Sequence, residues 1–139
     1  MKMNTADLLN ELRGFSDIGE FLKKYDNEFI GITVSDCLSD MLAVKEMSIS
    51  EVSADSGVGE YVYKIFSGER KPSRDVLIAI AFGMRLSFEE TQLVLRIAKL
   101  AALDVRNRRD SVIIHAIMNG KTVFDTDDIL SSGNLATIG

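Results

Sequence analysis

Cysteine, histidine, proline and tryptophan are scarce in this chain, and their scarcity excludes several kinds of site. The 139 residues include one cysteine, one histidine, one proline and no tryptophan. A single cysteine, Cys37, cannot form an intramolecular disulfide, and one cysteine with one histidine supplies too few ligands for a zinc site within one chain. No histidine lies near Cys37 in the sequence, so we interpret it as a small, partly buried apolar residue rather than as a nucleophile.

Motifs for enzyme chemistry are also lacking. The sequence contains no glycine-rich phosphate loop, no His-x-x-x-His or Cys-x-x-Cys pair and no serine in a nucleophile motif. The acidic group Asp125, Asp127 and Asp128 is without the glycine and the glutamate of a calcium loop, so we interpret it as a solvated helix start. The sequence therefore predicts a protein that is not an enzyme and that needs no metal or other cofactor.

Long apolar runs are missing as well. No stretch approaches the length of a membrane span, and the amphipathic N-terminus has no apolar core of the kind found in signal peptides. The composition is otherwise that of a globular chain, because 46% of the residues are hydrophobic and 27% are charged. From length and composition we expect one globular unit in the cytoplasm, without membrane contact.

Basic residues are in deficit, and their distribution is uneven. The formal net charge of −5 argues against indiscriminate binding to nucleic acid, because phosphate neutralisation by Lys and Arg supplies most non-specific affinity. Residues 1–56 hold 5 basic and 11 acidic side chains, residues 57–115 hold 10 and 7, and residues 116–139 hold 1 and 3. The middle segment is therefore the only net-basic part, and the acidic N-terminal part is a candidate surface for a basic protein partner.

Capping residues and apolar periodicity predict helices along the whole chain, so the expected fold class is all-α. Ser48 with Glu51 and Ser87 with Glu90 have the spacing of capping boxes. A helix is expected at Thr5–Arg13. A second is expected from Asp17, with an apolar face of Ile18, Phe21, Leu22 and Tyr25, and a third from Ser35 or Asp36. Further helices are expected at 74–83 after Ser73, from Asp104 or Asn107 to Gly120, and from Thr122 to Leu130.

Three segments complete this expectation. The helix after Ser87 is expected to be long and to reach Ala101. The connector at 27–34 is either extended or the start of the next helix, and the sequence leaves this open. Residues 134–139 are expected to form a loose end.

Residues 48–74 have the pattern of two short helices joined by a glycine turn. Val52 of the first helix is expected to face the core, and the small Ser53 is expected to let a second helix approach closely. Gly57 supplies a residue that can adopt positive φ and end this helix. Gly68 closes the second helix, and Pro72 prevents its continuation. This is the pattern of a helix-turn-helix.

The second helix of this motif, expected from Glu60 to Ser67, has two registers that the sequence does not separate. One register buries Val62 and Ile65, and the other buries Tyr63 and Phe66. The choice matters because the two registers aim different side chains away from the core.

At these residues the chain resembles the phage-repressor and Cro-type (xenobiotic-response-element-type) helix-turn-helix regulators. The resemblance covers residues 35–90, and the Gly-x-Arg-Lys-Pro-Ser segment is a fairly specific part of it. The matching positions are Leu38, Leu42, Lys45, Met47, Ser48, Glu51, Val52, Ser53, Ser56, Gly57, Val58, Ile65, Ser67, Gly68, Arg70, Lys71, Pro72, Ser73, Leu77, Ile80 and Ala81.

The chain also departs from the family pattern. The spacing from Gly57 to Gly68 is one residue shorter than in most relatives. Ile49 stands where relatives have a glutamine that can bind phosphate or base, and Glu60 can accept from a cytosine amine but repels phosphates.

The resemblance implies a five-helix DNA-binding domain at 35–103, preceded by a helical arm at 1–34 and followed by a helical extension at 104–139, all packed as one globular unit. The implied function is a sequence-specific transcriptional regulator of bacterial or phage type, a repressor, that binds double-stranded DNA at the nucleoid as a homodimer. Dimer contacts are expected from residues 88–131 or from the N-terminal arm.

The resemblance and the geometry of such motifs also name the site residues. Helix N-termini favour anions, and the first residues of the second helix meet base edges. The candidates for base contact are Gly59, Glu60, Tyr61, Tyr63 and Lys64, and the candidates for phosphate contact are Ser48, Arg70, Lys71 and Arg74.

The densest basic cluster consists of Arg106, Arg108 and Arg109, and it is a candidate for contact with an anion or a partner. These arginines either pair within the protein, with Asp104, Asp110 or the acidic arm, or bind DNA phosphates or a phosphorylated partner. The alternative to a DNA-binding regulator is a non-catalytic adaptor or antirepressor that keeps the helix-turn-helix fold and uses the acidic arm or this cluster on a protein.

Overall fold

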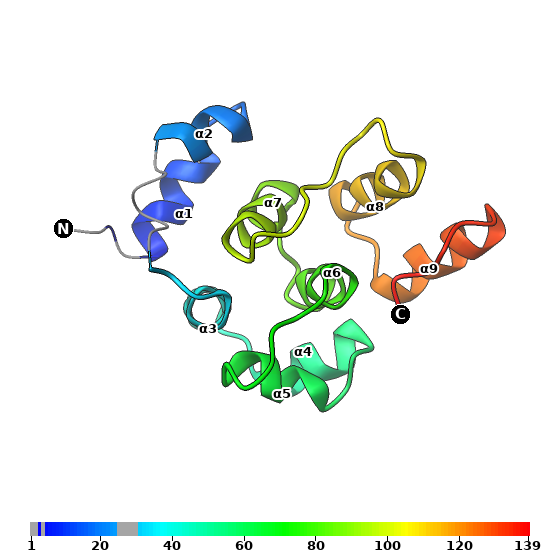
Figure 1. Cartoon of the computed structure of the whole chain (residues 1–139), viewed down its shortest axis with the longest axis horizontal. Helices are drawn as coiled ribbons and strands as arrows, with labels where there is room; N and C mark the ends of the chain where they lie inside the picture. Colours follow the sequence, from blue (N-terminus) through cyan, green and yellow to red (C-terminus); the bar gives the residue numbers. More distant parts are fainter. Residues whose placement is uncertain (1–2, 4, 25–30) are drawn as a thin grey trace.

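The computed structural model describes residues 3, 5–24 and 31–139, and in this part of the chain the secondary structure is helical throughout (Figure 1). The nine helices are α1 (Thr5–Arg13), α2 (Ile18–Lys24), α3 (Val34–Val44), α4 (Ile49–Ser56), α5 (Tyr61–Phe66), α6 (Arg74–Gly83), α7 (Phe88–Ile97), α8 (Arg108–Met118) and α9 (Val123–Ser132). The all-α prediction is confirmed for these residues. None of the helices described here is long and apolar enough to cross a membrane.

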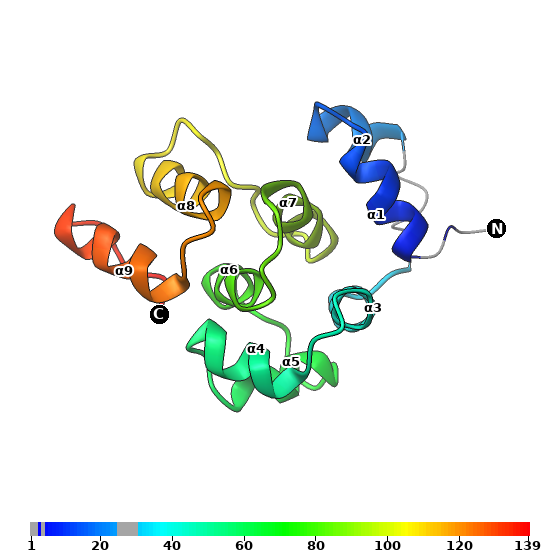
Figure 2. The ribbon, with the colours of Figure 1, turned by 180° about the vertical axis from the view of Figure 1, so that it is seen from behind.

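Helix α6 lies at the centre of the molecule, with the other helices around it (Figures 1 and 2). Helices α3, α4 and α5 lie on one side, α1 and α2 lie beside α7 at one end, and α8 and α9 form the other end. The α6 side chains Leu77, Ile78 and Ile80 are fully buried, which makes this helix the main contributor to the core. Burial of such side chains is the principal source of stability in a helical protein.

Side-chain caps set where the helices begin. Ser48, Ser73, Ser87, Asn107 and Thr122 each accept a hydrogen bond from the amide three residues further on, at 3.0–3.2 Å. The capping boxes predicted at Ser48 and Ser87 are both present. Asp17 Oδ1 likewise accepts from the Gly19 amide at the start of α2, at 2.8 Å. Because a cap acts within one turn of its own helix, these starts were readable from local sequence. Tyr25, the side chain of Leu22 and residues 27–30 of the expected connector lie outside the described residues.

The predicted start of α3 was wrong by a short distance. Thr33 caps this helix by accepting from the Asp36 amide at 3.1 Å, in place of Ser35 or Asp36. The Ser35 hydroxyl instead donates to the carbonyl of Phe66 at 3.0 Å, so it ties α3 to the end of α5.

The predicted extension of α7 to Ala101 was also wrong. The helix ends at Ile97, because Lys99 adopts a left-handed φ of 59° and the Leu100 amide donates back to the Leu95 carbonyl at 2.9 Å. The apolar spacing continues beyond this point because the next segment packs against the core as a loop. Helix α9, by contrast, runs two residues beyond the expected end at Leu130, to Ser132.

The C-terminal residues are not the loose end that the sequence suggested. Asp127 accepts hydrogen bonds from the amides of Ile138 and Gly139, at 2.7 and 3.1 Å. The Arg109 guanidinium donates to the carbonyls of Ala136 and Thr137, at 2.8 and 3.0 Å. Ile138 is buried as a result. Two side chains from distant helices therefore hold this segment, which local sequence reading could not reveal.

Helices α4 and α6 approach closely at a pair of small residues. A Cβ atom built on Gly83 would lie 2.9 Å from the Ser56 Cβ and backbone nitrogen, and 3.1 Å from the Val52 carbonyl oxygen. The small residue of α4 at this contact is Ser56, which is buried, whereas the sequence had suggested Ser53. The packing of α4 against α6 therefore depends on Gly83 having no side chain.

We expect Gly83→Ala to destabilise the protein by about 1–3 kcal/mol, because the added methyl group must push backbone atoms of α4 away. Alanine normally favours a helix over glycine by about 1 kcal/mol, so a loss of stability would identify the steric contact as its cause. The measurement is urea unfolding followed by circular dichroism. Gly133→Ala is the control, since the nearest atom would lie at 3.6 Å and its φ is −90°. Equal stability of the two variants would contradict the prediction.

Cys37 is buried in α3, and its environment suppresses ionisation. Burial, with the Asp40 carboxylate adding to it, raises the pKa of the Cys37 thiol to about 12. Because the thiolate is the reactive form, we expect the native protein to react very slowly with a thiol reagent such as DTNB at pH 8, and to react quickly once unfolded in urea. The absorbance change on DTNB addition measures both rates. A rapid reaction in native buffer would show that the thiol is accessible and would contradict this description.

Candidate nucleic-acid interface

The turn between α4 and α5 is built on two glycines with positive φ. Gly57 ends α4 with a φ of 73°, and Gly59 follows with a φ of 78°. The Gly59 amide donates back to the Ser53 carbonyl at 3.2 Å, and the Val58 amide donates to the Ser56 hydroxyl at 3.2 Å. A left-handed backbone is unfavourable for residues with a Cβ atom, so the glycines allow a sharp change of direction. The turn thereby fixes the direction in which α5 leaves α4.

The structure selects one of the two registers left open for α5. Val62 and Ile65 are fully buried, and Phe66 is also buried, so the first register is observed with Phe66 added to it. Tyr61 and Tyr63 are 40% and 46% exposed. Because the buried side of α5 faces α3 and α4, its outer side presents both tyrosines, together with Glu60 and Lys64. The base-contact candidates with side chains therefore share one exposed surface.

The segment after α5 carries further exposed basic residues. The Arg70 amide donates to the Lys64 carbonyl at 3.1 Å, which folds the segment back against the end of α5. The side chains of Lys64, Arg70 and Lys71 are exposed, and none of them forms a hydrogen bond or ion pair with a described residue. Pro72, the next residue in the chain, is buried. Three cations are thus available to an external anion at the edge of the molecule formed by α4 and α5 (Figure 1).

Ser48 has a different environment from these cations. Its amide and its hydroxyl both lie close to Glu51 Oε1, at 3.3 and 3.2 Å. The start of α4 therefore already holds a carboxylate, which is the kind of anion that a helix N-terminus attracts. A phosphate at this position would meet the negative charge of Glu51, which disfavours the predicted contact at Ser48.

Arg74 is directed into the protein. Its guanidinium donates to the carbonyls of Ala101 and Ala102, at 2.9 and 3.1 Å, and to both carboxylate oxygens of Asp110, at 3.2 and 2.8 Å. Asp110 is buried. The contacts of Arg74 are therefore with the protein itself, and we leave this residue out of the proposed phosphate contacts.

Arg109, in α8, forms the corresponding ion pair with a carboxylate of α6. Its guanidinium donates to Asp75 at 3.0 Å as well as to the carbonyls near the C-terminus. Arg74 and Asp75 begin α6, and Arg109 and Asp110 lie in the first turn of α8, so each Arg-Asp pair binds the other. We call these four residues the reciprocal Arg-Asp pairs. The dipeptide Arg-Asp occurs twice in the sequence, but no neighbouring residue indicates that the two copies contact each other.

The other two arginines of the basic cluster, Arg106 and Arg108, are exposed, and their side chains form no hydrogen bond or ion pair with a described residue. They belong to the loop 98–107 and the first turn of α8. The tip of this loop, yellow in Figure 1, lies on the far side of α6 and α7 from α4 and α5. The cluster is therefore divided, with Arg109 bound inside the protein and Arg106 and Arg108 on a different surface from the helix-turn-helix.

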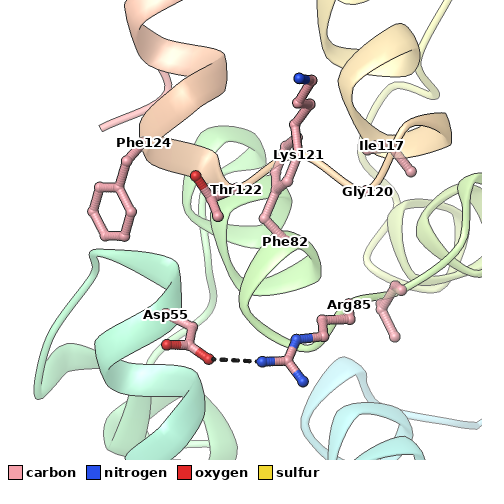
Figure 3. A pocket seen from close by; sticks show the side chains of 9 residues that line it. Asp55, Phe82, Arg85, Ile117, Gly120, Lys121, Thr122 and Phe124 are labelled. Atoms are coloured by element: carbon pink, nitrogen blue, oxygen red, sulfur yellow. Dashed lines mark ion pairs between the residues drawn. The ribbon is translucent and has the colours of Figure 1, made fainter.

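A small cleft of about 280 Å³ lies where α4 and α6 meet the connection from α8 to α9 (Figure 3). Asp55 and Arg85 form an ion pair across its rim at 3.7 Å, and both side chains are largely exposed. Phe124 packs on the turn of the motif, because a Cβ atom on Gly57 would lie 3.0 Å from its ring. Sequence analysis missed this cleft because its lining comes from three distant segments. Among the described residues, no group of His, Cys, Asp or Glu side chains is arranged to hold a metal ion.

Comparisons of the chain with protein-family models, curated proteins and solved structures gave no match. The resemblance to the repressor-type regulators therefore rests on the residues of segment 35–90 and stays a prediction. The structure of this chain adds two observations that do not depend on any relative, which are the exposed α5 surface and the three available cations.

We expect Asp110→Ala to lower the free energy of unfolding by about 3 kcal/mol, because it leaves the partly buried Arg74 without its carboxylate. Asp75→Ala is a matched comparison in the first turn of α6. Asp75 is 43% exposed against 7% for Asp110, and both arginines keep their two carbonyl partners, so the solvent-screened pair at Asp75 should cost only about 0–1 kcal/mol when it is lost. Urea unfolding of both variants measures the difference. Equal losses would show that burial does not govern the strength of the two ion pairs.

Proposed function

We propose that this protein is a sequence-specific DNA-binding transcriptional regulator, a repressor that acts at the nucleoid in the cytoplasm. The observation that carries the proposal is the outer surface of α5, where Tyr61, Tyr63 and Lys64 are exposed on a helix held by a glycine turn. A helix presented in this way can enter a major groove, where tyrosine and lysine side chains can contact base edges.

The flanking residues support the same function. Arg70 and Lys71 directly follow α5, are exposed, and have no partner among the described residues. Phosphate contacts from the flank of a reading helix fix its position on the duplex. We include Arg70 and Lys71 as phosphate contacts, and Gly59 and Glu60 remain in the proposed base-contact surface because they lead into α5.

We also propose that the regulator is a homodimer bound to a two-fold operator. The C-terminal helices expose Met118, Phe124 and Ile129, at 70%, 54% and 45%. Exposed apolar side chains favour association when a partner can cover them, and a two-fold dimer would place two α5 helices on successive half-sites.

A second candidate function is a non-catalytic adaptor or antirepressor that binds another protein. One observation favours it, which is the acidity of the motif itself. Segment 45–71 carries four basic and five acidic residues, and Glu51, Asp55 and Glu69 are exposed. Acidic surface repels DNA but suits a basic protein partner, as does the acidic N-terminal arm. The two candidates therefore differ in whether charge at Lys64, Arg70 and Lys71 governs binding to DNA.

We expect the triple variant Lys64→Glu/Arg70→Glu/Lys71→Glu to bind DNA at least about tenfold more weakly than the wild type, because one base-directed and two phosphate-directed cations are lost. The plot of log affinity against log salt should also become less steep, by about 2, because Arg70 and Lys71 are the phosphate contacts. The measurement is fluorescence anisotropy with DNA fragments selected by the wild-type protein from random sequence.

The charge-matched control is Lys23→Glu/Lys99→Glu/Arg108→Glu, whose positions are exposed and lie outside the helix-turn-helix. It changes net charge by the same amount, so it should leave affinity nearly unchanged. If no sequence is selected, or if both triple variants lose affinity equally, the regulator proposal fails and the adaptor becomes the favoured function.

A further inference from the structure

The loop 98–107, between α7 and α8, has no regular secondary structure but is held in place from below. The buried side chain of Gln92 donates to the Leu103 carbonyl at 2.9 Å and accepts from the Leu103 amide at 2.8 Å. An amide side chain that satisfies both polar groups of one residue fixes that residue as a strand partner would. The middle of the loop is therefore fastened to α7.

The residues on both sides of Leu103 are fastened as well. The Arg74 guanidinium holds the carbonyls of Ala101 and Ala102, and Asp110 accepts from the Asp104 amide at 3.0 Å. Asp104 in turn accepts from the Arg106 amide at 2.9 Å. These bonds order the backbone without help from any bound partner. A loop that is already ordered loses little further entropy when it binds something.

The same loop leaves apolar surface uncovered. Val105 is 70% exposed, which is as high as any large apolar side chain in the described residues. Beside it lies a shallow cleft of about 620 Å³, lined by Phe88, Ala102, Leu103, Asp104, Val105 and Ile114. Because hydrogen bonds hold the backbone at Leu103, Asp104 and Arg106, the loop presents Val105 at the edge of the cleft. An apolar partner side chain could fill it and remove this surface from water.

The charges around the cleft indicate the kind of partner. Lys99, Arg106 and Arg108 are exposed, and their side chains form no hydrogen bond or ion pair with a described residue. The acidic residues nearest in the chain to these arginines are Asp104, whose carboxylate accepts from the Arg106 amide, and Asp110, which is buried and paired with Arg74. Arginine binds carboxylates through two parallel hydrogen bonds, so the exposed cations favour an acidic ligand.

We propose that loop 98–107 and the first turn of α8 form a docking site for an acidic segment of a partner protein. One apolar side chain of that segment enters the cleft beside Val105, and its carboxylates bind Arg106 and Arg108. An apolar cleft offers nothing to a phosphate backbone, which favours a peptide over nucleic acid. The site lies on the far side of α6 and α7 from α5 (Figure 1), so it does not depend on the proposed DNA binding.

The test is a selection of random displayed peptides on the full-length wild-type protein, with removal of peptides that also bind Arg106→Glu/Arg108→Glu. This variant should fold, because glutamate near the start of α8 is favourable for a helix. Selected peptides are then synthesised with a fluorophore and measured by anisotropy. The proteins compared are the wild type, Arg106→Glu/Arg108→Glu, Val105→Ser, and the charge-matched control Lys23→Glu/Lys121→Glu.

We expect selected peptides to combine Asp or Glu with one apolar side chain. Affinity should fall by about tenfold or more in Arg106→Glu/Arg108→Glu, fall less in Val105→Ser, and stay unchanged in the control. The proposal is overturned if no peptide is selected, if selected peptides lack acidic residues, or if the control loses as much affinity. It is also overturned if duplex DNA binds this loop in preference to peptide, since the surface would then be a nucleic-acid contact.

Discussion

The reciprocal Arg-Asp pairs are the constraint on which the arrangement of the C-terminal half depends. Arg74 binds Asp110 at 2.8 Å and Arg109 binds Asp75 at 3.0 Å, so the first turns of α6 and α8 are joined twice. Each arginine also donates to two backbone carbonyls, Arg74 to the loop after α7 and Arg109 to the C-terminal segment. Two ion pairs thus position a loop, a helix and a chain end against the central helix.

These pairs also separate the basic residues into two groups. Arginines that look equivalent in sequence are either bound inside the protein, as Arg74 and Arg109 are, or exposed without a described partner, as Arg70, Arg106 and Arg108 are. Only the second group can meet an external anion without breaking a folded contact. The net-basic middle segment of the chain is therefore less available to nucleic acid than its composition suggests. The basic residues that remain available lie on two different surfaces, one beside α5 and the other at loop 98–107.

Sequence predicted most features that are set within one helical turn, with the cap of α3 and the end of α7 as exceptions, and missed those set across the chain. The caps at Ser48, Ser73 and Ser87 and the positive φ of Gly57 follow from residues in direct sequence proximity. The partner of Arg74 is 36 residues away, and no local pattern names it. The register of α5 was undecided for a related reason, because both alternatives place apolar residues at helical spacing. Only contact with α3 and α4 distinguishes Val62 and Ile65 from Tyr63.

The position of Arg74 connects the two proposed surfaces physically. It stands at the start of α6, a few residues after Arg70 and Lys71, and its guanidinium holds the loop that carries Val105. Because buried, hydrogen-bonded ion pairs resist displacement when both partners are satisfied, this residue keeps the two surfaces in a fixed relation. A contact at one surface can influence the other only by moving α6, whose side chains are tightly packed. The structure therefore favours two independent binding surfaces on one rigid unit over a coupled switch.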